Sequence, residues 1–270
     1  MARMSCCFFC VMNMMTLLIS MIIVGQISKT WRPVIIMYGS APCAGFLKMP
    51  ILSLGISILI ASVIGLIALF CRVLCLHRVY LWVMLLIIIA LFSFIVFSLL
   101  VTSKGPREES SGREYSLRQF SGWLRRNVVD VKNWFGINNC LVKADVCNSF
   151  GKKLSVLPAA VVWEVVSPVE SGCCKPPPQC GYKFKNVSYW EEPKSGLTSM
   201  DVDCVTWKNE EDTVCYSCES CKAGYLVQVR DDWLILNAFN ICFLIYLLIV
   251  LAIGFFSLPN PSEANKFSSV

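Results

Sequence analysis

Four long stretches of this chain contain no charged residue, and they constrain its fold more than any other feature. Each stretch is 23 to 30 residues long. They lie between Arg3 and Lys29, between Lys48 and Arg72, between Arg78 and Lys104, and between Asp232 and Glu263. A helix needs about 20 mostly apolar residues to cross the roughly 30 Å hydrocarbon core of a bilayer. Each stretch therefore predicts one tilted membrane-spanning helix.

Composition favours a membrane protein over a soluble one. Hydrophobic residues make up 56% of the chain and charged residues only 16%, whereas soluble domains average about 45–50% and about 25%. Buried core helices of a soluble fold are the alternative, and four such stretches in one chain disfavour it. The first stretch could instead be a cleaved signal peptide, but it is longer than the roughly 7–15-residue apolar core of a signal and lacks an obvious cleavage site.

We therefore expect an all-α membrane protein with a bundle of four transmembrane helices. The predicted spans are residues 6–27, 49–70, 80–101 and 234–256, and the predicted ends and connections are residues 1–5, 28–48, 71–79, 102–233 and 257–270. The segment 102–233 is long enough to fold as a domain. Lysines and arginines in the short loops give no clear orientation under the positive-inside rule.

The placement of the cysteines decides the orientation. Of the 16 cysteines, nine lie in the segment 102–233, and Cys43 lies in the loop 28–48. So dense a cluster persists as disulfides only in an oxidising compartment. Both loops are therefore expected outside the cell or in the secretory lumen, with both termini and the turn 71–79 in the cytosol. A glycosylation sequon at Asn186 supports this orientation.

Ten external cysteines allow five bridges, and one bridge could join the two loops. The alternative is that one of them stays free or pairs between molecules. The sequence cannot choose among the many pairings. The ten predicted disulfide cysteines are Cys43, Cys140, Cys147, Cys173, Cys174, Cys180, Cys204, Cys215, Cys218 and Cys221.

The run Cys215-x-x-Cys218-x-x-Cys221 also resembles the start of an iron–sulfur or zinc ligand set. The fourth ligand is missing, however, and the one histidine of the chain, His77, lies in the predicted cytosolic turn. We therefore expect disulfides at these positions, with no metal and no cofactor.

A separate set of cysteines lies at the predicted cytosolic ends of the first and second spans. Cysteines next to a membrane on the cytosolic side are candidates for S-palmitoylation, because an acyl chain adds hydrocarbon that partitions into the bilayer. The alternative is that some of them simply serve as small apolar residues. The candidates are Cys6, Cys7, Cys10, Cys71 and Cys75.

Small residues recur every four positions in the second span, at Ser53, Ser57, Ala61 and Gly65. Such a stripe lets two transmembrane backbones approach closely. We expect it to face a neighbouring helix, the first span. Asn13 in the first span is expected to hydrogen-bond across the bundle.

Neither transport nor catalysis finds support in the residues. No Asp, Glu, Lys or Arg falls in the middle of a predicted span, where pumps and ion pathways usually keep one. A hydrolase needs a nucleophile with an oriented base, and the single histidine lies on the wrong side of the membrane. We therefore expect that this chain is not an enzyme.

The segment 102–233 opens with a helical pattern. Apolar residues step by three or four positions, which predicts one amphipathic helix with these residues on its covered face. They are Leu117, Phe120, Leu124, Val128, Val131 and Phe135. Beyond about residue 158 the long helical periodicity ends, so a loop-rich, disulfide-bridged region is expected there.

These features together resemble the tetraspanin family, in its plant form. The similar stretches are "SGWL" at 121–124, "SPVESGCCKPPPQCGY" at 167–182, "DCVTWKNE" at 203–210 and "CYSCESCKAG" at 215–224. The resemblance covers nearly the whole chain. It departs at "VGQISKTWRP", residues 24–33, which has one glycine where plant relatives often have several.

The resemblance implies a membrane scaffold that associates laterally with other tetraspanins and with other membrane proteins, with no nucleic-acid partner. It implies organisation of microdomains that affect cell differentiation, development, signalling or trafficking, in the plasma membrane or in endosomal or vesicular membranes. It also implies a lipid or sterol in an intramembrane cavity. Two alternatives stay open: a receptor whose external loop binds a soluble ligand, and a transporter or channel subunit.

The stretch "SGCCKPPPQC", residues 171–180, is expected to be a folding junction. Gly172 is predicted to permit an unusual turn, and the three following prolines to fix an extended course toward Cys180. Adjacent cysteines must point apart, because a bridge between neighbours is strained. The resemblance implies that they bond to two distant cysteines, with Cys173–Cys221 as the favoured pair.

Overall fold

The computed structural model describes residues 2–27, 43, 45–71, 74–105, 116–148, 150–151, 166–186, 189–208 and 215–256. The chain divides into two compact units. Residues 1–37, 45–97 and 237–270 form the first, called the helical unit here. Residues 38–44 and 98–236 form the second, called the bridged unit because its cysteines are joined in disulfides.

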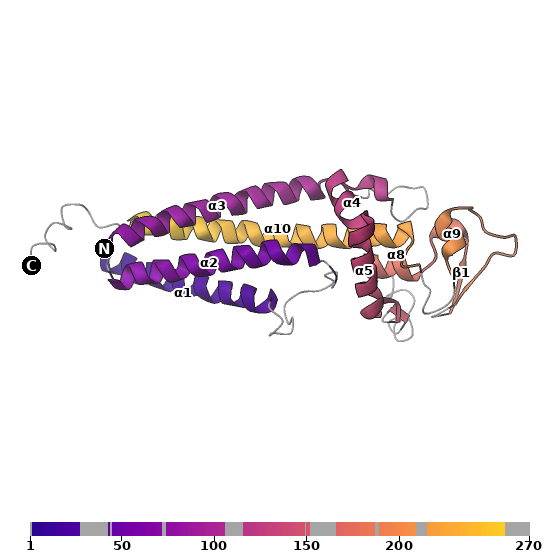
Figure 1. Ribbon diagram of the computed structural model, residues 1–270, viewed down its shortest axis with the longest axis horizontal. Helices are drawn as coiled ribbons and strands as arrows, with labels where there is room; N and C mark the ends of the chain where they lie inside the picture. Colours follow the sequence, from indigo (N-terminus) through magenta and orange to yellow (C-terminus); the bar gives the residue numbers. More distant parts are fainter. Residues whose placement is uncertain are drawn as a thin grey trace, which may run out of the picture. The chain divides into compact units, whose positions relative to one another are not determined.

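The helical unit is built from α1 (Ala2–Ile27), α2 (Gly45–Cys71), most of α3 (Leu74–Thr102) and the second half of α10 (Glu219–Phe256), as Figure 1 shows. The segment Arg78–Thr102 and the helix Glu219–Phe256 are each long and apolar enough to cross a membrane. The apolar sections found in α1 and α2, Cys10–Ile22 and Gly55–Ile67, are shorter. Two of the four predicted spans therefore reach spanning length among the described residues.

The core of the helical unit lies between α2, α3 and α10. Ile58 and Ala61 of α2 pack there with Tyr80 and Leu91 of α3 and with Leu247 of α10, and all five are nearly inaccessible. The outer faces are apolar as well, including exposed Leu86 and Phe92 on α3. Helices that are apolar all round fit a lipid surrounding and would be unstable in water.

A hydrogen-bond cluster joins α1 to α10 inside this unit. The Tyr246 hydroxyl donates to the carbonyl oxygen of Met12 at 2.7 Å and lies 2.9 Å from the Thr16 hydroxyl. Thr16 also donates to the Met12 carbonyl at 2.8 Å. Asn13, Thr16 and Ser20 thus form a buried polar face on α1 at helical spacing. Of these three residues, only Asn13 was predicted from the sequence to bond across the bundle.

The stripe of small residues on α2 is only partly buried. Ala61 and Gly65 lie in the packed interior, whereas Ser57 is exposed, so its predicted place at a helix interface is wrong. The side chain of Ser53 lies outside the described residues. A Cβ atom on Gly65 would approach Asn13 Oδ1 of α1 and Tyr80 Cε2 of α3, each to 2.7 Å. Gly65 therefore faces two helices, and the first span is one of them.

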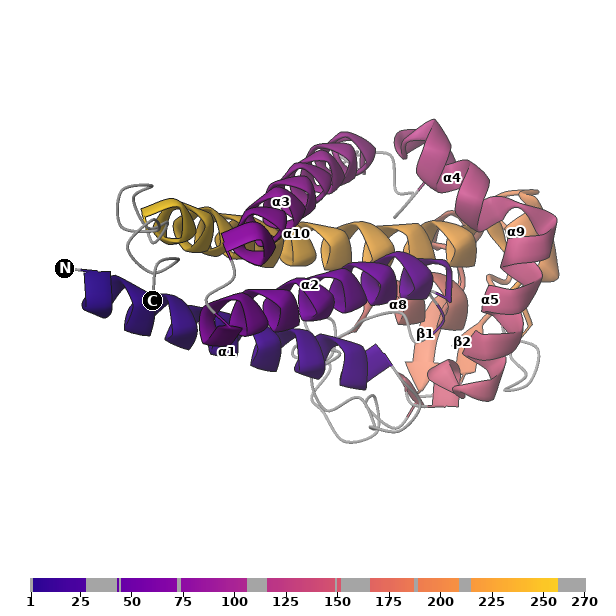
Figure 2. The same ribbon diagram turned by 60° about the vertical axis from the view of Figure 1, so that its left-hand side comes forward.

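The bridged unit contains η1 (Leu117–Gln119), α4 (Gly122–Val129), α5 (Val131–Lys143), α8 (Pro168–Cys174), η2 (Pro178–Cys180), the strands β1 (Lys183–Asn186) and β2 (Tyr189–Glu191), α9 (Val202–Thr206) and the first half of α10. The two strands form an antiparallel hairpin in which Phe184 pairs with Trp190. Figure 2 shows α8 beside the N-terminal part of α10.

The predicted single amphipathic helix is two helices, which corrects the sequence analysis. Asp130 has an extended backbone, with φ −52° and ψ 134°, and its carboxylate accepts a hydrogen bond from Lys132 N as the cap of α5. Phe120, Leu124 and Val128 are buried as predicted, but Val131 and Phe135 are 85% and 67% exposed. The break at Asp130 shifts the helical phase, so that α5 buries Trp134, Ile137 and Leu141 instead.

Candidate functional site

The junction sequence at residues 167–182 folds around the short helix α8. The Ser167 hydroxyl accepts a hydrogen bond from Glu170 N at 3.2 Å, and a Glu170 carboxylate oxygen accepts one from Ser167 N at 2.9 Å. This reciprocal capping box satisfies two amides at the start of the helix. Pro168, in the first turn, is compatible with that position because its missing N–H is not needed there.

Gly172 lies within α8 and makes no turn, so the predicted unusual turn is wrong. Its role is to allow a close crossing of α8 and α10. A Cβ atom on Gly172 would collide with the carbonyl oxygen of Ser220, and one on Gly224 with the carbonyl oxygen of Pro168. Each of these Cβ atoms would also lie 3.2 Å from the Cα atom of the other glycine. Only residues without a side chain fit at this crossing.

The adjacent cysteines at the end of α8 diverge. Cys173 is joined to Cys221 of α10, with their Cα atoms 4.2 Å apart, and Cys174 is joined to Cys147, with their Cα atoms 5.2 Å apart. Successive residues of a helix point about 100° apart, which sends the two sulfurs in different directions. The structure thus gives the pair Cys173–Cys221 that the resemblance implied.

Three further bridges complete the unit. Cys43 is joined to Cys140 of α5, which links the short loop 28–48 to the large segment. Cys180 is joined to Cys204, and Cys215 to Cys218. All ten predicted cysteines are therefore paired in the structure. The sulfurs of the CxxCxxC run are used in bridges, and the described residues contain no group of three potential metal ligands.

The proline run is extended only in part. Lys175 and Pro177 have extended backbones, and then Pro178–Cys180 forms the 3₁₀ turn η2. Gly181 ends that turn with a positive φ of 81°, a conformation that glycine adopts readily. The course toward Cys180 therefore bends after two prolines.

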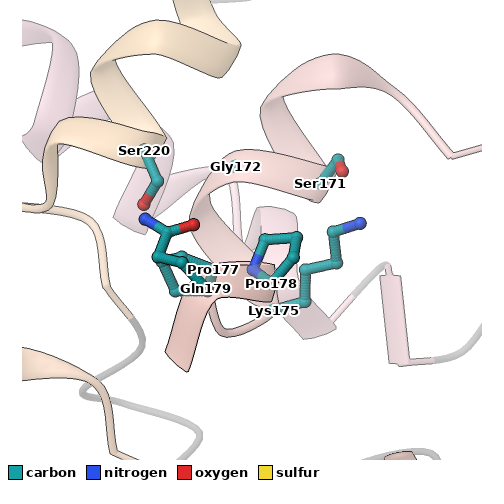
Figure 3. Close-up of a pocket in the computed structure, with 7 residues that line it drawn as sticks. All are labelled: Ser171, Gly172, Lys175, Pro177, Pro178, Gln179 and Ser220. Atoms are coloured by element: carbon teal, nitrogen blue, oxygen red, sulfur yellow. The ribbon is translucent and has the colours of Figure 1, made fainter. Parts of the chain in front are cut away.

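A shallow hollow lies over this junction (Figure 3). It is lined by Ser171, Gly172, Lys175, Pro177, Pro178, Gln179 and Ser220. In the figure the Gln179 amide and the Ser220 hydroxyl lie toward α10, whereas the Lys175 amine points away from them. The hollow brings together no acid–base pair and no nucleophile with a base, so its residues supply no catalytic set.

Asp203 connects α9 to the start of α10. Its two carboxylate oxygens accept hydrogen bonds from Glu219 N at 2.9 Å and from Ser220 N at 2.8 Å. The carboxylate therefore caps a 38-residue helix from another segment, at the end where the helix dipole favours negative charge. The neighbouring Cys204 is bridged to Cys180, so this cap also holds the hairpin region onto α10.

Aromatic side chains pack around the Cys215–Cys218 bridge. Trp207 is buried against both cysteines, and Tyr182 and Trp190 cover it from the hairpin side. Burial, with a smaller contribution from the charge of Glu192, raises the pKa of Tyr182. Tyr216 accepts a hydrogen bond from Cys147 N at 3.4 Å. Burial is also the main reason that the pKa of Tyr216 is raised.

The bridged unit exposes apolar side chains at α9. Met200, Val202 and Val205, called the α9 patch here, are 88%, 75% and 64% exposed. Val202 and Val205 are three residues apart on α9, so they lie on neighbouring parts of the same helix face. Apolar side chains that gather on an exposed surface are typical of protein interaction sites. These three residues were not predicted from the sequence as a site.

The modification candidates have the following places. Asn186 is the last residue of β1, while Val187 and Ser188 of its sequon lie outside the described residues. Cys10 is a half-buried free thiol of α1, and Cys242 is an exposed free thiol of α10. Cys6 and Cys7 belong to α1, Cys71 ends α2 and Cys75 lies in α3, and their side chains are outside the described residues.

The helical unit and the bridged unit together define a multi-pass membrane protein with a disulfide-stabilised domain. The family model of the tetraspanins matches residues 5–258. Tetraspanin-8 of Arabidopsis thaliana is 37% identical over 234 residues, which is 85% of each chain. Protein TORNADO 2 of the same plant is 36% identical over 259 residues, 94% of this chain and 93% of its own. No solved structure matches the chain significantly.

The chain belongs to the tetraspanin family. Tetraspanins act as membrane scaffolds, and the family assignment does not favour the ligand receptor or the transporter subunit that the sequence analysis kept as alternatives. Members of the family are in general not enzymes.

Proposed function

We propose that this chain is a four-span tetraspanin with both termini in the cytosol and the bridged unit outside the cell or in the secretory lumen. The four charge-free stretches support the number of spans. The ten bridged cysteines all belong to the two predicted external loops, and disulfides are stable only in an oxidising compartment. The proposed spans are residues 6–27, 49–70, 80–101 and 234–256. The plasma membrane or endosomal or vesicular membranes are the proposed location.

The proposed role is lateral organisation of other membrane proteins and other tetraspanins into microdomains that affect differentiation, development, signalling or trafficking in plants. One observation carries this role: the α9 patch is held on a framework of bridges at Cys204 and Cys180 and of the Asp203 cap. A pre-ordered apolar patch loses little entropy on binding, which suits selection among neighbouring proteins.

Proximity labelling in native plant membranes tests this role. The full-length protein, fused to a labelling enzyme, is compared with the double variant Val202→Ser/Val205→Ser. Val131→Ser on α5 is the matched control, because Val131 is equally apolar and 85% exposed. We expect the double variant to lose a subset of labelled membrane proteins and the control to keep it. An unchanged set in the double variant would contradict selection by the α9 patch.

Two modifications belong to the same proposal. We propose N-glycosylation of Asn186, at the tip of the hairpin, and palmitoylation among Cys6, Cys7, Cys10, Cys71 and Cys75. Asn186→Gln should abolish the mobility shift that glycosidase treatment produces. Replacing the five cysteines with serine should abolish labelling by an acyl-exchange reagent, and labelling that persists would place the acyl chain elsewhere.

The proposed lipid or sterol in the membrane would be held by apolar contacts. The hydroxyls of Thr16 and Tyr246 already hydrogen-bond to each other and to the Met12 carbonyl, so they have little capacity left to bind a sterol hydroxyl. Native mass spectrometry of the protein extracted in a mild detergent tests this proposal. A bound sterol should persist in a Thr16→Val variant, and its loss there would indicate a polar contact instead.

A further inference from the structure

The point at which α10 enters the bilayer is marked by its charge pattern. Asp231 and Asp232 are the last charged residues before a charge-free stretch that extends to Glu263, so Trp233 lies at the boundary. Tryptophan is enriched at membrane–water interfaces because its ring is apolar and its N–H is polar. Arg230 Nε donates to the carbonyl oxygen of Thr102, the last residue of α3, at 3.1 Å. The end of α3 is therefore at the same level.

Helix α4 is held at this boundary by a second tryptophan. Trp123 of α4 contacts Trp233, with ring centroids 6.0 Å apart and ring planes inclined by 48°. Trp233 is buried, whereas Trp123 stays 41% exposed. Leu124 and Val128 anchor the opposite side of α4 in the core of the bridged unit. The exposed part of Trp123 therefore lies beside the residue at which the charge-free stretch of α10 begins.

The exposed surface of α4 is also cationic. Arg125 and Arg126 are exposed, and Arg118 just before the helix is exposed as well. Arg126 is three residues after Trp123, so the two side chains are neighbours on the helix surface. The nearby acid, Asp130, is used as the cap of α5. A planar guanidinium at headgroup depth suits a phosphate, which it can bind through two parallel hydrogen bonds.

We propose that α4 is a membrane-surface helix: Trp123 inserts at the interface, and Arg125 and Arg126 bind the phosphates of phospholipid headgroups in the outer leaflet. The occupant is the lipid surface, since the Trp123–Trp233 contact puts α4 at the level where the charge-free stretch of α10 begins. Through this contact, binding of the bridged unit to the membrane surface depends on the headgroups of the surrounding lipids. It does not depend on the α9 patch or on the identity of any protein partner.

Hydrogen exchange of the full-length protein in nanodiscs tests the proposal. One nanodisc contains phosphatidylcholine and the other an uncharged galactolipid that carries no phosphate. We expect the amides of α4 to exchange more slowly in phosphatidylcholine, by up to about fivefold, the most that an exposed ion pair typically contributes. The double variant Arg125→Gln/Arg126→Gln should lose this difference. Lys132→Gln, which removes an exposed cation from α5, should keep it.

Other results would overturn the proposal. Equal exchange in the two lipids would exclude phosphate binding by α4, and equal loss in the Lys132 variant would indicate a general charge effect. Slow exchange restored by free inorganic phosphate in galactolipid nanodiscs would indicate an ion site. A photo-reactive amino acid at position 126 provides a test without charge variants: it should form lipid adducts, whereas the same group at the exposed Met200 position should not. Equal adducts at both positions, or none at 126, would contradict lipid contact.

Discussion

Asp203 caps α10 across the chain: its carboxylate accepts a hydrogen bond of 2.8 Å from the amide of Ser220, which lies in a different helix. Asp203 is buried, and its second oxygen accepts from Glu219 N. The cap joins the part of the bridged unit that carries the α9 patch to the helix that continues into the membrane. The geometry of the patch therefore depends on this carboxylate together with the neighbouring Cys180–Cys204 bridge.

Asp203→Ala should destabilise the bridged unit by about 1–2 kcal/mol, the usual loss for a helix cap, because two partly buried amides lose their acceptor. Asp203→Asn should cost less, since an amide oxygen still accepts one of the two hydrogen bonds. Thermal unfolding of the full-length protein in nanodiscs, followed by near-ultraviolet circular dichroism, measures both. Equal melting temperatures for the wild type and the alanine variant would show that the cap does not stabilise the unit.

Gly172→Ala and Gly224→Ala should each destabilise the crossing of α8 and α10 by about 1–3 kcal/mol, the typical cost of overpacking. Gly136→Ala on α5 is the matched control, because nothing lies within 4 Å of its would-be Cβ atom. The control should stabilise the protein by about 0.5–1 kcal/mol through helix propensity. The same thermal measurement applies, and destabilisation by Gly136→Ala equal to that of the other two would refute a specific close crossing.

The bridges should differ in what their removal costs. Cys215 and Cys218 are three residues apart, whereas Cys147 and Cys174 are 27 apart. In the loop-entropy model the short bridge contributes about 2 kcal/mol and the longer one about 3.5 kcal/mol. Alanine pairs at each bridge, compared by unfolding in denaturant, measure the difference. A larger loss at Cys215/Cys218 would mean that packing with Trp207 outweighs loop entropy there.

Gly65→Leu should impair folding and delivery to the cell surface, because a side chain there would meet both Asn13 and Tyr80. Ser57→Leu, two turns earlier on the same predicted stripe, should be tolerated, because Ser57 is exposed. Surface biotinylation of the two variants in cells reports delivery. Normal delivery of Gly65→Leu would contradict close packing at this glycine.

Features set by local pattern could be predicted from the sequence. A stretch of more than twenty residues without charge indicates a membrane span, because only such a stretch is well solvated by lipid. A dense set of cysteines indicates disulfide bridges and an oxidising compartment. The buried residues Phe120, Leu124 and Val128 followed from helical spacing. The prediction failed at Val131 and Phe135, because an Asp130 cap ended the helix and the apolar spacing continued across the break only by coincidence.

Features set by contacts between distant segments could not be predicted. Nothing near Asp203 in the sequence indicates that its partners are the amides of Glu219 and Ser220. A backbone amide is common to nearly all residue types, so the residue type does not reveal which amide is the donor. From the local sequence, Gly172 and Gly224 each suggest a turn or a position with no special role. Both are needed because α8 and α10 cross closely at these two residues. The same holds for Tyr246, whose hydroxyl bonds to the Met12 carbonyl of α1, 234 residues away.

The divergence of Cys173 and Cys174 is the feature on which the bridged unit and its proposed function depend most. Mass spectrometry of the protein isolated from native membranes, alkylated before digestion and without reduction, measures it directly. We predict cross-linked peptides that join Cys173 to Cys221 and Cys174 to Cys147, with no alkylation at any of the four. Free thiols at Cys173 or Cys174 in the mature protein, or both cysteines joined to other partners, would contradict it.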